Sequence, residues 1–69
     1  MSMYEKIGAI ARDNWNCRWS FGDLANELGL KSPWHAGQQI ERAWDYFNRR
    51  GDTGTCSAIS RVFWSKKRV

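Results

Sequence analysis

The sequence predicts a single, mainly α-helical domain, a small bundle of three to four helices. Apolar residues recur at helical spacing in four separate stretches. Ser20, Ser32 and Asp52 stand where the last three stretches would begin, and all three residue types cap helix N-termini. Gly29 and Gly51 stand where two of the helices would end. The length of 69 residues suits one domain, and five Trp, three Phe and two Tyr supply apolar area for its core.

The first helix is expected at about 3–13, where Met3, Ile7, Ile10 and Ala11 share one face. The sequence NWNC at 14–17 should end it, because Asn is unfavourable inside helices.

The second helix is expected to begin after Ser20, with Asp23 in the position of a capping-box acid. Its buried stripe would be Leu24, Ala25 and Leu28, and Gly29 suits the position just past its end.

The third helix is expected to begin at Ser32-Pro33, an N-cap followed by Pro at the first helical position. Arg49 and Arg50 fall in its last turn, where cations favour the helix dipole, and Gly51 closes it. Its inward face would consist of Ala36, Ile40, Ala43, Trp44 and Phe47.

The fourth stretch permits two interpretations. Ala58, Ile59, Val62 and Phe63 fit a helix capped by Asp52, whereas Ile59–Trp64 is also rich in strand-favouring residues. The helix is the favoured interpretation. In the alternative, residues 55–64 form a wing strand or hairpin and the NCRWS sequence at 16–20 forms a second short strand.

The predicted core combines these inward faces. Trp15 and Trp44 are expected inside and Trp34 is expected to be the most exposed tryptophan. The expected core residues are Ile7, Ile10, Leu24, Ala25, Leu28, Ile40, Trp44, Phe47, Ile59 and Phe63.

The net charge of +4 is unevenly placed. Residues 1–60 carry seven Lys/Arg and seven Asp/Glu, so the excess lies in a basic C-terminal tail at 61–69 with Arg61, Lys66, Lys67 and Arg68. A basic tail favours an anionic partner such as nucleic acid, although it also serves solubility.

No residue pattern indicates catalysis, a cofactor or a metal. Cys17, Cys56 and His35 lack zinc-ligand spacing, and no nucleophile stands in register with a base. We therefore expect free thiols and no enzymatic activity. No apolar run approaches the roughly 20 residues of a membrane span and no secretory signal is evident, so the expected location is cytoplasmic.

The segment DLANELGL at 23–30 resembles the first half of a bacterial helix-turn-helix. In that pattern a small residue lies where the helices cross and a Gly four positions later makes the turn, which matches Ala25 and Gly29. The resemblance covers residues 21–40. The sequence departs from it after the Gly, since His35 occupies the usual apolar position and Ala36 follows one residue later. The KSP turn is thus one residue longer than usual, as in winged-helix variants.

The resemblance implies binding of double-stranded DNA, with the helix at about 33–50 in the major groove and a regulatory role in transcription. Such modules usually bind as dimers, although no heptad pattern is present here to supply the contact. Gln38 would pair with adenine and Arg42 with guanine. The candidate DNA-binding residues are Lys31, Ser32, His35, Gln38, Gln39, Arg42, Arg49, Arg61, Lys66, Lys67 and Arg68.

The alternative function is binding and modulation of a host protein through exposed aromatic residues. Trp34, Trp19 and Trp64 lie on a helix flank or at segment boundaries, and Trp is enriched at binding hot spots. The segment ERAWDYFNRRGDTGTCSAISRVF at 41–63 is similar to part of small phage and prophage proteins. That setting accommodates a DNA-binding regulator and a host-factor modulator alike.

Overall fold

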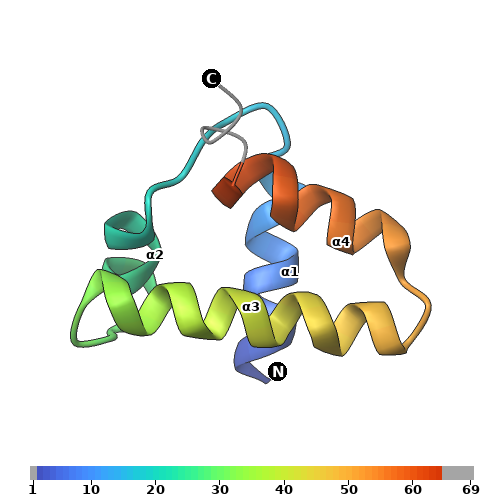
Figure 1. The fold of residues 1–69 in the computed structure, drawn as a ribbon. Helices are drawn as coiled ribbons and strands as arrows, with labels where there is room; N and C mark the ends of the chain where they lie inside the picture. The colour runs from blue at the N-terminus through green and yellow to red at the C-terminus, as the bar shows by residue number, and fades with distance from the viewer. Residues whose placement is uncertain (1, 65–69) are drawn as a thin grey trace.

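A computed structural model describes residues 2–64 of the chain. Within them lie four α-helices and a terminal π-helical turn, and no strand (Figure 1). The elements are α1 (Met3–Asp13), α2 (Phe21–Leu28), α3 (Pro33–Arg49), α4 (Thr53–Ile59) and η1 (Ser60–Trp64). The predicted small helical bundle is confirmed.

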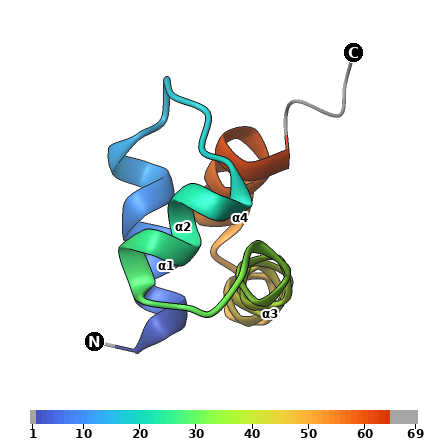
Figure 2. The same cartoon turned by 90° about the vertical axis from the view of Figure 1, so that its left-hand side faces the viewer.

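The longest helix, α3, organises the bundle. Its N-terminal half packs beside α2, and its C-terminal half lies under α4 (Figure 1). Helix α1 crosses behind α3 and also packs against α4. Viewed nearly along α3, the other helices lie to one side of it, so the opposite side of α3 is left uncovered (Figure 2).

Side-chain caps fix the helix starts where the sequence predicted them. The Ser20 hydroxyl accepts a hydrogen bond from the Asp23 amide at 3.0 Å, and the Asp23 carboxylate accepts one from the Ser20 amide at 3.1 Å. The Ser32 and Asp52 side chains cap α3 and α4 by accepting hydrogen bonds from the His35 and Thr55 amides, without a reciprocal bond to the cap amide. A further capping box, Ser2 with Glu5, begins α1 and was not predicted.

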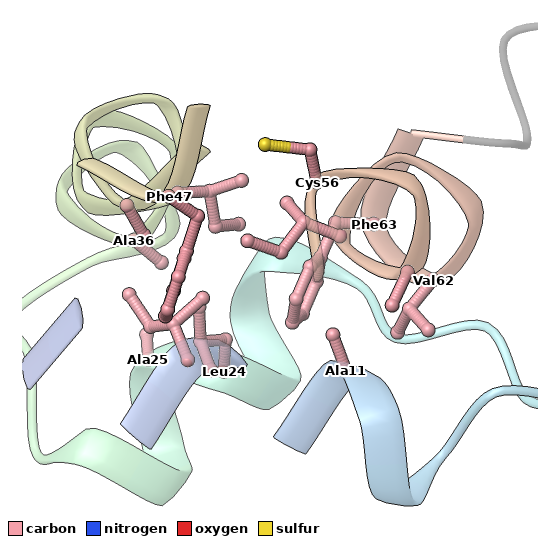
Figure 3. Close-up of a cluster of buried hydrophobic side chains, with 13 residues drawn as sticks. Ala11, Leu24, Ala25, Ala36, Phe47, Cys56, Val62 and Phe63 are labelled. Carbon is pink, nitrogen blue, oxygen red and sulfur yellow. The ribbon is translucent and has the colours of Figure 1, made fainter. Parts of the chain in front are cut away.

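The core joins α1, α3 and α4 and extends to α2 (Figure 3). Most of the predicted core is confirmed as buried, while Ile10, Leu28 and Trp44 are half-buried at its edge. The buried apolar residues are Ile7, Ala11, Leu24, Ala25, Ala36, Ile40, Ala43, Phe47, Cys56, Ala58, Ile59, Val62 and Phe63.

The prediction that Trp15 is a core residue was wrong. Trp15 is 43% exposed because α1 ends at Asp13 and the following turn carries the indole outside the bundle. Trp34, at 65%, is the most exposed of the large apolar residues described, as predicted.

The strand interpretations of residues 55–64 and 16–20 were also wrong. Ala58, Ile59, Val62 and Phe63 are all buried on one face of a continuous helical segment, which alternation along a strand would not permit. The 16–20 segment is irregular and joins the last helix through one backbone hydrogen bond, from the Trp19 amide to the Val62 carbonyl at 3.0 Å.

Candidate functional site

Helices α2 and α3 pack against each other and are joined by a short turn at 29–32. Gly29 adopts a left-handed conformation with φ of 69°, and the next amide, of Leu30, donates to the Ala25 carbonyl at 2.8 Å. Ala25 is buried at 4% exposure. The positions that the sequence matched to the crossing residue and the turn therefore have the expected burial and backbone geometry.

A second small residue at this crossing was not predicted. A Cβ atom added to Gly37 would lie 3.0 Å from the Phe21 ring, so the absence of a side chain lets the first residue of α2 approach α3 closely. The signal was a glycine inside a predicted helix, which usually has a packing reason.

The uncovered face of α3 presents four of the candidate DNA-binding residues as exposed side chains. His35, Gln38, Arg42 and Arg49 are exposed, and Gln39 is half-buried. Lys31 is exposed in the turn before the helix. The side chains of Gln38 and Arg42 make no hydrogen bond or ion pair with any described residue, so their polar groups remain available to a partner.

Other candidates are already engaged within the protein. The Ser32 hydroxyl lies 2.8 Å from Nδ1 of His35 and also caps α3, so both side chains are held at the helix start. Arg49 forms an ion pair with Asp45 at 2.9 Å. Arg61 contacts Trp15 in the turn after α1.

The charge on the outward face of α3 is balanced. Glu41 and Asp45 alternate with Arg42 and Arg49, and the acidic pair lies toward the middle of the helix. Lys66, Lys67 and Arg68 lie outside the described residues, so three of the four excess positive charges are not placed.

A groove of about 320 Å³ lies beside the first half of α3. It brings Trp34 and Trp64 together, as the protein-binding interpretation requires, whereas Trp19 is half-buried and packs edge-on against Phe63 with ring centres 6.5 Å apart. The groove is lined by Phe21, Trp34, Gly37, Gln38, Glu41 and Trp64.

The cysteines lie apart. Cys17 is exposed, whereas Cys56 is buried and its thiol donates to the Trp44 carbonyl at 3.3 Å. Burial raises the pKa of the Cys56 thiol, and the nearby Asp52 carboxylate raises it further, which disfavours the nucleophilic thiolate. Among residues 2–64 no group of His, Cys, Asp or Glu side chains is arranged to hold a metal ion. The helices of that range are all too short or too polar to cross a membrane.

No protein-family model, curated protein or solved structure matches this chain.

Proposed function

We propose that the protein is a double-stranded DNA-binding protein that inserts the N-terminal half of α3 into the major groove. One observation carries this proposal. Gln38 and Arg42 are exposed and without partners among the described residues, on the helix that follows the left-handed Gly29 turn. In helix-turn-helix proteins the N-terminal residues of the second helix contact base edges.

The chemistry of each side chain suits it to either a base edge or a phosphate. The Gln38 amide matches the donor and acceptor of an adenine edge, and the Arg42 guanidinium matches the two acceptors of guanine. Lys31, before the helix, suits a phosphate, as do Lys66, Lys67 and Arg68. Glu41 and Asp45 would be repelled by phosphates, so we propose that the part of α3 in the major groove ends at Arg42, before Asp45.

We further propose a regulatory role in transcription, in a phage or plasmid setting. One domain of this size covers few base pairs, so two copies on adjacent half-sites would bind a natural operator. No enzymatic activity is part of this proposal.

The test is a fluorescence-anisotropy titration of a mixed-sequence duplex at two salt concentrations. We expect binding that weakens steeply with salt, and weakens further in the Lys66/Lys67/Arg68→Ala variant, because each lost phosphate contact reduces counterion release. A preferred DNA site is then selected from a random duplex pool. The Gln38→Ala and Arg42→Ala variants should each lose about 1–3 kcal/mol of preference for the selected base at one position of that site.

Arg49→Ala is the matched control for this selection, since Arg49 is on the same helix but is paired with Asp45. It should leave base preference unchanged. Absence of binding at the lower salt concentration would refute the DNA proposal.

A second candidate function is binding of another protein through the groove beside Trp34. The observation that favours it is the 65% exposure of Trp34 in a groove that also contains Trp64. Large exposed aromatic residues in a concave surface are typical of interaction hot spots.

A random-peptide display selection tests this second function. We expect peptides that bind the parent protein and the Trp15→Ala control, which removes an exposed tryptophan outside the groove, but not the Trp34→Ala variant. Selected peptides that bind the Trp34→Ala variant as well as the parent would refute it.

A further inference from the structure

We infer that the groove beside α3 binds an arginine side chain of a partner protein. The inference rests on the second proposed function and specifies the chemistry of the partner. It follows from the aromatic lining of the groove and from the Glu41 carboxylate among the described lining residues.

The aromatic lining comes from three separate elements. Phe21 begins α2, Trp34 lies in the first turn of α3, and Trp64 ends η1. Aromatic rings carry partial negative charge on their faces, and Trp attracts cations most strongly. A groove that contains two Trp and one Phe therefore favours a positively charged group that also has apolar or planar surface.

Glu41 gives the groove its charge. Of the described lining residues, Glu41 is the one that carries a charge. Its side chain is exposed and forms no ion pair with any other described residue. Asp45, one turn further along α3, is by contrast already paired with Arg49. An unpaired carboxylate beside aromatic rings attracts a cation and repels a phosphate, so the groove is unsuited to the DNA backbone.

The composition of the groove favours a guanidinium group. Gly37 contributes no side chain, and a Cβ atom there would lie 3.0 Å from the Phe21 ring, so this ring packs directly against the backbone of α3 within the lining. A planar guanidinium stacks on aromatic faces and pairs with a carboxylate through parallel hydrogen bonds, whereas an ammonium is strongly hydrated. An arginine side chain can therefore stack on the aromatic rings and pair with the Glu41 carboxylate at the same time.

The test uses two small probes, Nα-acetylarginine amide and Nα-acetylcitrulline amide, which have similar shape and differ in charge. Binding is followed by nuclear magnetic resonance through the indole N–H signals, assigned with single Trp→Phe variants. We expect the arginine probe to shift the signals of Trp34 and Trp64 and to leave that of Trp15 unchanged. The citrulline probe should bind about threefold to fivefold more weakly.

Glu41→Gln should weaken the arginine probe by a similar factor, because it removes the charge but keeps the side-chain size. Asp45→Asn is the matched control and should leave the affinity unchanged, since Asp45 does not line the groove. Equal binding of both probes, or equal binding by the parent and Glu41→Gln, would overturn the inference.

Two further outcomes would also overturn it. Probe binding seen only in the Lys66/Lys67/Arg68→Ala variant would assign the groove to this chain's own basic segment. Display-selected peptides could depend on Trp34 yet bind equally well when their arginines are replaced by citrulline. That result would refute the arginine inference and leave the second proposed function standing. If no selected peptide depends on Trp34 for binding and neither probe binds, the arginine inference and the second proposed function are both refuted.

Discussion

The guanidinium carbon of Arg61 lies 4.8 Å from the centre of the Trp15 ring, and its Nε donates a 3.1 Å hydrogen bond to the Trp15 carbonyl. These contacts join the turn after α1 to η1, across 46 residues of sequence. They give both residues a structural role that the sequence did not indicate, since Trp15 was expected in the core and Arg61 on phosphate. In the proposed function Gln38 and Arg42, and not Arg61, contact the DNA.

Arg61→Ala should lower the free energy of unfolding by about 1 kcal/mol, because it removes an exposed cation–π contact and one hydrogen bond. The DNA affinity should change less than in Arg42→Ala. Urea denaturation and the anisotropy titration measure the two effects. Arg18→Ala, at an exposed arginine in the loop that carries Trp15, is the control and should leave stability within about 0.5 kcal/mol. A loss of DNA affinity in Arg61→Ala as large as in Arg42→Ala would contradict the structural role.

Thr55→Val should destabilise the protein by about 1–3 kcal/mol. The Thr55 hydroxyl is buried; it accepts a hydrogen bond from Arg12 at 2.9 Å and donates one to Asp52 at 2.8 Å, so it links α1 to the start of α4. Valine preserves the shape and removes both bonds. The measurement is thermal or urea unfolding beside Thr53→Val, an exposed threonine in the same turn, which should be nearly neutral. Equal effects of the two variants would argue against the link.

The stability should depend on the ionisation of Asp52. Hydrogen bonds from the Thr55 side chain and then the Thr55 amide lower the pKa of the Asp52 carboxyl below its ordinary value of 3.8, and Arg12 and Arg50 lower it further. Because the folded pKa lies below the unfolded one, the stabilisation is complete above 3.8 and is lost as the pH falls through the folded pKa.

Asp52→Asn should therefore reduce stability at neutral pH and flatten its decline below about pH 4. Unfolding free energies measured across the acid range test this expectation. Asp13→Asn is a control, since Asp13 is exposed and makes no hydrogen bond or ion pair with another described residue. An unchanged acid profile in Asp52→Asn would show that another group governs it.

Gly8→Ala should destabilise the bundle by about 1–3 kcal/mol through overpacking. The added Cβ atom would lie 2.6 Å from the Phe47 ring and 3.0 Å from the Thr55 methyl group, where α1 meets α3 and α4. The double variant Gly8→Ala/Phe47→Leu should recover part of the loss relative to additive single effects, because the shorter side chain makes room. A double-mutant cycle with no coupling would contradict this contact.

Gly29→Ala should cost about 1–2 kcal/mol, because an L-residue with a side chain is strained at positive φ. No atom lies within 4 Å of the added Cβ, so the backbone conformation alone sets the cost. Gly29→Asn should be milder, since Asn tolerates this conformation better. Both are measured by urea unfolding, and equal stability of the alanine variant and the parent would refute the requirement.

The local chemistry of the sequence determined where the helices begin and end. Ser20 with Asp23, Ser32 with Pro33, and Asp52 each supply a cap within three residues of the chain, and Gly29 and Gly51 take the positive φ values of 69° and 77° that their turns require. Helical spacing also identified the faces that α3 and α4 bury. These features depend on neighbours a few positions apart, which one sequence contains in full.

The tertiary structure decided what depends on distant contacts. Thr55 is buried and bonds to Arg12, 43 positions away, and the exposure of Trp15 follows from a loop path that Arg61 and Val62 stabilise. The candidate groove is lined by Phe21, Trp34 and Trp64 from three elements, and the close approach of Phe21 to α3 depends on Gly37. Periodicity specifies which side of a helix faces inward, but not which residue of another element lies opposite, because that depends on helix crossing angles and loop paths set by the whole core.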